Sequence, residues 1–159
     1  MKVGIILGSS SDKDVMRNAG KILDEFGVLW TAHILSAHRT PELLKEKIME
    51  MEADGVGCFI AGAGLAAHLP GVIASMTTIP VVGVPINAAL DGMDSLLSIV
   101  QMPKGIPVAT VGINNSTNAG LLAVQFLCNG DSELKNKMKK YRVEMKEKFA
   151  KENKDGVTL

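Results

Sequence analysis

The segment SAHRTP, at 36–41 of this 159-residue sequence, contains the side chains best suited to chemistry. The imidazole of His38 can give and take a proton near neutral pH, as a general acid/base does. The guanidinium of Arg39 matches the geometry of a phosphate group and binds it bidentately. A histidine in a loop is often structural or solvated, but an arginine beside it favours a catalytic His38 next to a bound phosphate.

A serine-rich segment, GSSSD at 8–12, suits an anion. We expect Gly8 to permit a tight turn, and the hydroxyls of Ser9 and Ser11 to donate to the anion beside a helix N-terminus. Serine and aspartate before a helix are also ordinary N-caps, so the capping interpretation stays open. Asp12 fits a helix cap and an acceptor for ribose hydroxyls, and the two roles are compatible.

A third segment, AGAGLAAHLPG at 61–71, is rich in glycine and alanine, which let a backbone approach a ligand closely. His68 lies at the start of a predicted helix, where substrate contact and helix capping or packing fit equally well. His33 lies inside a predicted strand, and we interpret it as structural. The segment therefore predicts a wall of small residues with one further histidine.

Strands and helices alternate along the chain and determine where these segments lie. The predicted strands, which are apolar throughout, cover 3–7, 29–35, 56–61, 79–84 and 106–111. The predicted helices cover 12–26, 41–51, 69–76, 94–100 and 118–128. Apolar strands separated by helices imply a parallel sheet covered on both faces. We therefore expect an α/β fold in one domain over 1–159, a three-layer α/β/α sandwich whose parallel sheet of about five strands is flavodoxin-like in order.

All the segments that could carry chemistry follow predicted strands. In a doubly wound sheet, ligands bind beyond the carboxyl ends of the strands, at the switch point between the first and third strands. A fourth segment, PINAALDG at 85–92, follows the fourth predicted strand. We therefore expect four loops to form one site at one edge of the sheet.

A long helix is predicted over about 131–152, beyond the sandwich. Its apolar residues form one narrow stripe, which consists of Leu134, Met138, Tyr141, Met145 and Phe149. Docking on its own sheet and packing on a neighbouring subunit are both compatible with this stripe. The lysines around it are expected to form a solvated face rather than a nucleic-acid-binding patch.

The composition excludes several classes of protein. Lys+Arg and Asp+Glu are equal at 17 each, so the chain lacks the basic surplus of a sequence-independent nucleic-acid binder. Its first apolar run is too short for a signal peptide or a membrane span, and we expect a cytoplasmic protein. We interpret Cys58 and Cys128 as buried thiols rather than as a disulfide or metal ligands. The absence of GxGxxG, P-loop, HExxH and GxSxG motifs predicts proton transfer without a metal or redox cofactor.

Together, the loop motifs resemble those of one family, the class I N5-carboxyaminoimidazole ribonucleotide mutases of purine biosynthesis. The matching motifs, in the family's order over about residues 2–150, are GS and SD within 8–12, SAHRTP at 36–41, AGAG at 61–64, AAHLPG at 66–71, DSLLSIVQMP at 94–103 and NAGLLA at 118–123. The resemblance implies interconversion of N5-carboxyaminoimidazole ribonucleotide (N5-CAIR) and 4-carboxy-5-aminoimidazole ribonucleotide (CAIR) on the route to IMP. It implies carboxylate transfer from N5 to C4 without a cofactor or metal, in a homo-octamer whose C-terminal helix reaches a neighbouring subunit.

The resemblance also implies roles for individual residues. His38 would be the general acid/base, with His68 as a second catalytic histidine. The ribose and phosphate would be held by Ser9, Ser11, Asp12, Ser36 and Arg39. The base and carboxylate would be enclosed by Ala63, Gly64, His68 and Leu69. Two departures stand out, because Leu65 occupies a position where the family commonly has glycine, and the loops at 87–91 and 114–117 are shorter than usual.

Three other functions stay open. The class II relatives are carboxylases that use free carbon dioxide and aminoimidazole ribonucleotide (AIR); we expect AGRSN-like residues after their third strand, where this chain has AGAGL. A flavodoxin-like receiver or binding module needs an aspartate at the end of the third strand, and here Ala61 and Gly62 stand there. A carboxylating domain for another ribonucleotide-like cofactor would share the motifs of this chain.

Overall fold

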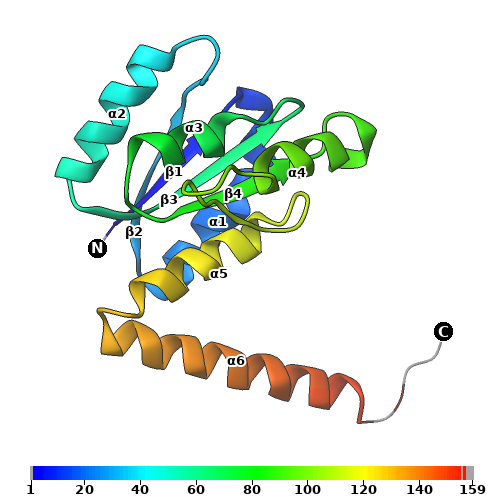
Figure 1. The fold of residues 1–159 in the computed structure, drawn as a ribbon. Coiled ribbons are helices and arrows are strands. Elements are labelled where there is room, and N and C mark those ends of the chain that lie inside the picture. Colours follow the sequence, from blue (N-terminus) through cyan, green and yellow to red (C-terminus); the bar gives the residue numbers. More distant parts are fainter. Residues whose placement is uncertain (1, 155, 157–159) are drawn as a thin grey trace.

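Five parallel strands form the centre of the molecule within the residues that the computed structural model describes, 2–154 and 156. The strands are β1 (Lys2–Leu7), β2 (Leu29–Ile34), β3 (Val56–Gly64), β4 (Val81–Ile86) and β5 (Ala109–Thr110). Their order across the sheet is β2-β1-β3-β4-β5, and Figure 1 labels the first four of these strands, β2, β1, β3 and β4. The chain therefore changes direction across the sheet between β1 and β3, which is the flavodoxin-like switch point that the sequence predicts.

Helices cover both faces of this sheet. One face packs on α1 (Lys13–Phe26) and α5 (Ser116–Leu127), and the other packs on α2 (Pro41–Ala53), α3 (Leu69–Met76) and α4 (Met93–Val100). Neighbouring residues of β1 belong to different cores, because Ile5 packs on the α1 and α5 side and Ile6 on the α2 and α3 side. Side chains alternate across a strand, so a strand with two covered faces is apolar throughout. The predicted three-layer sandwich is confirmed.

The bounds of the strands differ from the predicted ones by one residue in β1 and β2 and by two residues at each end of β4, and the differences are larger in β3 and β5. β3 continues past Ala61 to Gly64, because Ala63 and Gly64 still pair with Pro85 and Ile86 of β4. The fifth strand is only Ala109–Thr110 instead of 106–111. Pro107 has no backbone N–H to donate, which prevents a longer ladder there. The extension of β3 moves the small residues of its end closer to the site.

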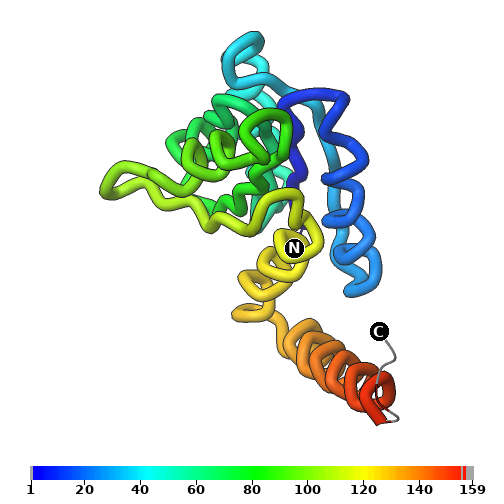
Figure 2. Tube along the Cα trace, turned by 90° about the vertical axis from the view of Figure 1, so that its right-hand side faces the viewer, coloured from blue at the N-terminus to red at the C-terminus, as the bar shows by residue number. Residues whose placement is uncertain are grey.

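The C-terminal helix α6 (Ser132–Glu152) lies against the sandwich at its beginning only. Leu134 and Met138 are buried, and Tyr141 packs on Phe26 with ring centroids 5.5 Å apart. Farther along the helix the apolar stripe is open to solvent, and the side chain of Phe149 is 60% exposed. Figure 2 shows the rest of α6 projecting away from the sandwich. The first half of the stripe therefore docks on the sandwich of its own chain, and the second half is exposed on this chain.

The remaining sequence-based expectations concern thiols, membranes and the chain ends. Cys58 is buried, and burial raises the pKa of its thiol to about 12, whereas Cys128 is only half-buried; both are free thiols. None of the described helices combines the length and apolar composition that a bilayer crossing requires. The ends of the expected 1–159 domain, residues 1, 155 and 157–159, lie outside the described residues.

Candidate active site

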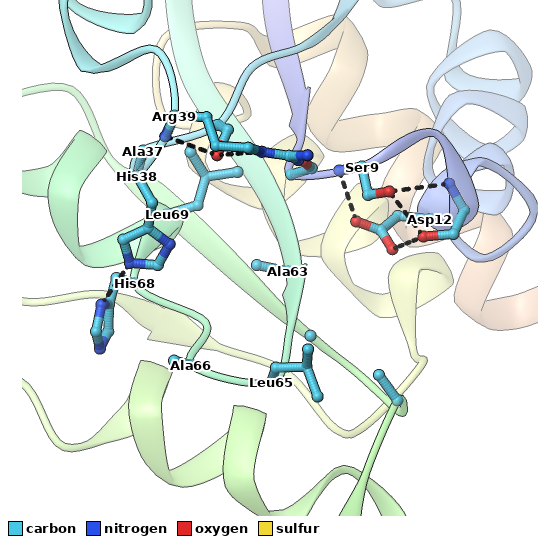
Figure 3. Close-up of a pocket in the computed structure, with 15 residues that line it drawn as sticks. Ser9, Asp12, Ala37, His38, Arg39, Ala63, Leu65, Ala66, His68 and Leu69 are labelled. Atoms are coloured by element: carbon cyan, nitrogen blue, oxygen red, sulfur yellow. Dashed lines mark hydrogen bonds between the residues drawn. The ribbon is translucent and has the colours of Figure 1, made fainter.

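A pocket of about 520 Å³ opens at the carboxyl ends of β1 and β3, at the switch point of the sheet (Figure 3). All ten residues that the resemblance singles out line this pocket: Ser9, Ser11, Asp12, Ser36, His38, Arg39, Ala63, Gly64, His68 and Leu69. A volume of this size is typical of small-molecule sites. The pocket therefore brings together the predicted residues from three segments of the chain that are up to 60 positions apart.

Five more residues line the pocket without having been predicted as site residues. They are Gly8, Ala37, Leu65, Ala66 and Ala88. Four of them are glycine or alanine, which carry no chemical signature of their own. Their position in loops that follow strands is the signal that could have found them.

The first wall of the pocket is a short 3-10 turn, η1 (Ser10–Asp12), that precedes α1. Ser9 caps this turn, with its hydroxyl accepting from the backbone N–H of Ser11 at 3.3 Å. In return, the carboxylate of Asp12 accepts from the backbone N–H of Ser9 at 3.0 Å, which completes a capping box. Ser9 and Asp12 therefore cap the 3-10 turn, whereas Asp12, the N-cap residue of α1, makes no side-chain capping hydrogen bond to that helix. The loop presents serine hydroxyls to the pocket. The backbone N–H groups of Ser9 and Ser11 already have hydrogen-bond partners within the loop.

Gly8 lies in a bend directly after β1, where the sequence predicts a turn. Its backbone lies outside the left-handed region, and its N–H donates to the carbonyl of Gly62 at 3.1 Å. The residue thus continues the pairing of β1 with β3 by one step. The change of direction begins in the bend at Gly8 and Ser9 and continues in the turn that Ser9 caps.

The carboxyl group of Asp12 is the buried ionisable group of the pocket wall. Burial raises its pKa above the ordinary value, and hydrogen bonds from the Ser11 hydroxyl and the Ser9 backbone oppose this rise. The side chain is thus held in one orientation by two neighbouring groups of its own loop, the Ser9 N–H and the Ser11 hydroxyl.

Arg39 connects the loops that follow β1 and β2. Its Nε donates to the hydroxyl of Ser36 at 3.2 Å, and its Nη2 donates to the carbonyl of Gly8 at 3.1 Å. The hydroxyl of Ser36 also accepts from the backbone N–H of Arg39. These contacts hold the guanidinium in the pocket wall, and its positive charge suits an anionic ligand.

His38 and His68 contact each other although they lie 30 positions apart. Nε2 of His38 lies 2.8 Å from Nδ1 of His68, and the rings meet at 75° with centroids 4.9 Å apart. Figure 3 shows the other nitrogen of the His38 ring, Nδ1, on the side that faces Ala63 and the pocket. His68 is the N-cap residue of α3, but its side chain makes no capping hydrogen bond. The structure therefore favours the site interpretation of His68 over the capping one.

β3 ends in a sharp change of direction that carries the chain to His68. Gly64 lies so close to β4 that a Cβ atom there would be 3.1 Å from the Cβ of Ala88 and from the carbonyl of Ile86. Leu65 follows with a φ of 56°, in the left-handed region. That conformation costs a residue with a side chain about 1–2 kcal/mol. The resemblance implies a glycine at this position, and glycine adopts this conformation without that cost.

Two further expectations concern His33 and metal ions. His33 is half-buried on the edge strand β2 and is not part of the pocket wall. Across the described residues, no three His, Cys, Asp or Glu side chains gather closely enough to hold a metal ion.

Comparison with known proteins identifies the relatives of this pocket. Residues 2–148 match the AIR carboxylase family. The chain belongs to the AIR carboxylase family. Its similarity to members of this family extends over almost the whole length of the described sandwich.

Individual members of the AIR carboxylase family carry two different names. The chain is 58% identical over 146 residues to an N5-carboxyaminoimidazole ribonucleotide mutase of Pyrococcus abyssi, covering 91% of this chain and 84% of the relative. It is 56% identical over 144 residues to a phosphoribosylaminoimidazole carboxylase of Candida albicans, covering 90% of this chain and 25% of that longer protein. The crystal structure of Treponema denticola PurE has the same fold, with a TM-score of 0.89, 29% sequence identity and 97% of each chain covered.

Proposed function

We propose that this chain is an N5-carboxyaminoimidazole ribonucleotide mutase of de novo purine biosynthesis, which converts N5-CAIR to CAIR. The observation that carries the proposal is the pocket in which the His38–His68 pair faces a wall formed by Arg39 and the capped Ser9–Asp12 loop. Membership in the AIR carboxylase family and the high identity to mutases from several organisms support the assignment.

The first chemical step removes the carboxylate from N5. The bond between N5 and the carboxylate carbon breaks, its electron pair stays on N5, and carbon dioxide is released into the pocket. N5 takes a proton from the protonated His38 and becomes the amino group of AIR. This step places a small neutral molecule beside an electron-rich ring carbon.

The second step makes the new bond at C4. C4 attacks carbon dioxide with its ring electron pair, and the bond between C4 and the new carboxylate forms. His38, now neutral, removes the hydrogen from C4 and returns to its protonated form. The single proton that His38 gives to N5 is thus recovered from C4, and no proton is gained or lost over the cycle.

His68 acts on this chemistry through His38. When His38 is protonated on both nitrogens, its Nε2–H donates to Nδ1 of a neutral His68. This bond fixes the orientation of the ring and leaves Nδ1 of His38 for the substrate. His68 is in this sense a positioning residue.

The polar wall holds the non-reacting part of the substrate. Arg39 provides the charge for the phosphate, and the hydroxyls of Ser9, Ser11 and Ser36 donate to phosphate or ribose oxygens. The carboxylate of Asp12 accepts from ribose hydroxyls. Binding energy from this remote part of the nucleotide positions N5 and C4 beside His38.

The assembly that fits this chain is a homo-octamer in the cytoplasm, in which α6 packs on a neighbouring subunit. Support comes from the apolar residues of the projecting half of α6 that are open to solvent, Val143, Met145 and Phe149. Sedimentation velocity of the purified protein tests the assembly. A species of eight subunits is expected, and a monomer contradicts it.

The alternative function is AIR carboxylation with free carbon dioxide. It is favoured by the description of the family and by the carboxylase name of the Candida albicans relative. The experiment supplies N5-CAIR and AIR separately, each with and without bicarbonate. The proposal predicts rapid turnover of N5-CAIR without bicarbonate, whereas rapid turnover of AIR that requires bicarbonate would establish the carboxylase instead.

A further inference from the structure

Thr40 is the last residue of the loop that carries His38 and Arg39 into the pocket, and it does not line the pocket itself. It is the N-cap residue of α2, a position where a threonine hydroxyl ordinarily accepts from a backbone N–H of the first helical turn. The side chain of Thr40 makes no such capping hydrogen bond. Its hydroxyl therefore serves another part of the structure.

That hydroxyl forms two hydrogen bonds with the backbone of Ser36, at the other end of the loop. Oγ1 of Thr40 accepts from the N–H of Ser36 at 3.3 Å and donates to the carbonyl of Ser36 at 3.1 Å. A hydroxyl can do both at once, because it has one hydrogen and two lone pairs. The same carbonyl also accepts from the backbone N–H of Thr40 at 3.0 Å. Three hydrogen bonds therefore close the loop over 36–40, and two of them need the side chain of Thr40.

The two side-chain bonds fix the direction in which the chain leaves β2. The N–H of Ser36 belongs to the peptide group before this residue, and its carbonyl belongs to the peptide group that leads to Ala37. Peptide groups are planar, so the conformation of Ser36 is set by the two dihedral angles between them. One hydroxyl holds both groups and thus restrains both angles. His38 follows two residues later, at the centre of the closed loop.

His38 depends on this closure more than Arg39 does. The guanidinium of Arg39 has an anchor outside the loop, because its Nη2 donates to the carbonyl of Gly8 at 3.1 Å. The side chain of His38 is exposed, and its ring contacts the ring of His68. The position of the His38 ring is therefore set by the backbone of its own loop together with the contact to His68.

We propose that Thr40 is a positioning residue for the transfer reaction, whose hydroxyl holds the loop over 36–40 in the conformation that presents His38 to N5 and C4. This inference rests on the proposed mutase function. Without the hydroxyl, the backbone bond between Thr40 and Ser36 still closes the loop, but the peptide groups on both sides of Ser36 gain freedom. A small displacement of an acid/base group slows the chemical step, while a nucleotide held by other residues still binds.

Thr40→Val tests this proposal, because valine has the shape of threonine without the hydroxyl. We expect kcat on N5-CAIR to fall roughly 10-fold and KM to change less than about threefold, since Arg39 keeps its anchor on Gly8. Thr40→Ser keeps the donor and the acceptor and is expected to restore kcat to within about twofold of the wild-type protein. Thr40→Ala removes the same hydroxyl with less bulk and gives a second measurement if valine disturbs folding.

Thr77→Val is the matched control. Thr77 is half-buried like Thr40, and its hydroxyl also has two partners, the N–H of Ile79 and the carboxylate of Glu52, which lie outside the loop that carries His38. A fall in kcat in Thr40→Val that serine restores, with wild-type kcat in Thr77→Val, supports the proposal. An equal fall in both valine variants overturns it, as does a rise in KM at unchanged kcat in Thr40→Val.

The same assays separate this inference from the function on which it rests. A wild-type protein that leaves N5-CAIR unchanged contradicts the mutase function and the positioning role with it. A wild-type protein that converts N5-CAIR, with Thr40→Val and Thr40→Ala equally fast, contradicts the positioning role alone. The melting temperature of each variant is measured to show that it is folded.

Discussion

The rings of His38 and His68 meet edge to face, with Nε2 of His38 2.8 Å from Nδ1 of His68. A single hydrogen lies between two nitrogens at this distance, so one ring donates and the other accepts. Two protonated rings cannot share the contact, since both nitrogens would then carry hydrogens. The pair therefore carries at most one positive charge while the contact is intact, and the charge on His38 is what the first chemical step requires.

His68→Phe tests whether the ring of His68 acts on the reaction through the ring of His38. Phenylalanine keeps an aromatic ring but accepts no hydrogen bond, so we expect kcat to fall roughly 10- to 100-fold, with a smaller change in KM. His68→Asn places an amide oxygen near the position of Nδ1 and is expected to recover part of the loss. Steady-state kinetics on N5-CAIR provide the measurement.

A double variant supplies the control for the histidine pair. If His68 works only by positioning His38, His68→Phe has no further effect in a His38→Asn background. Additive losses in the double variant would show that His68 has a role independent of His38.

Arg39→Lys tests the charged wall. Lysine keeps the charge but cannot reproduce the simultaneous contacts with the Ser36 hydroxyl and the Gly8 carbonyl. Hydrogen bonds of charged groups are worth roughly 1.5–3 kcal/mol, so KM should rise roughly 10- to 100-fold, with kcat much less affected. Initial rates over a range of N5-CAIR concentrations decide this. A fall in kcat at unchanged KM would place Arg39 in the chemical step instead.

Asp12→Asn separates stability from binding. The raised pKa means that the folded state holds the proton more tightly than the unfolded state does. The contribution of Asp12 to the free energy of unfolding therefore falls as the pH rises through the interval between the unfolded and the folded pKa. At pH 7 that contribution is lost, and asparagine, which still accepts from the Ser9 N–H, should leave the stability equal or higher.

Substrate binding should respond to this substitution in the opposite direction. A neutral acceptor binds ribose hydroxyls more weakly than a carboxylate, so KM is expected to rise roughly fivefold. Thermal unfolding at pH 4 and pH 7 and steady-state kinetics test both parts. Asp12→Ala is the control, because it also loses the cap and should cost about 1–2 kcal/mol. If Asp12→Asn destabilised the protein as much as Asp12→Ala, the claim that asparagine keeps the capping contact with the Ser9 N–H would be contradicted.

The sequence predicts the position of the site well because parallel strands end at one edge. Ser9 and His38 follow β1 and β2, and Ala63 lies at the carboxyl end of β3, so their meeting is a consequence of topology. The contact between His38 and His68 was beyond sequence reasoning, since it depends on side-chain rotamers and on the turn at Leu65.

Strand ends were the weakest part of the sequence-based prediction. Glycine and alanine are poor strand formers, which hid the continuation of β3 to Gly64. Pro107 within an apolar run shortens β5, because a residue without an N–H cannot complete the ladder. Pairing with the neighbouring strand, rather than the strand propensity of single residues, therefore decides where β3 ends and how long β5 is.

The most direct test of the account is the turnover of His38→Asn with N5-CAIR, followed by the ultraviolet absorbance of CAIR. Loss of a general acid/base is expected to lower kcat by at least ~10²–10⁴-fold. Calorimetry on the same variant should show that the nucleotide still binds, since the Arg39 wall is unchanged. Near-normal turnover of His38→Asn would contradict the proposed role of this imidazole as the carrier of the proton between N5 and C4.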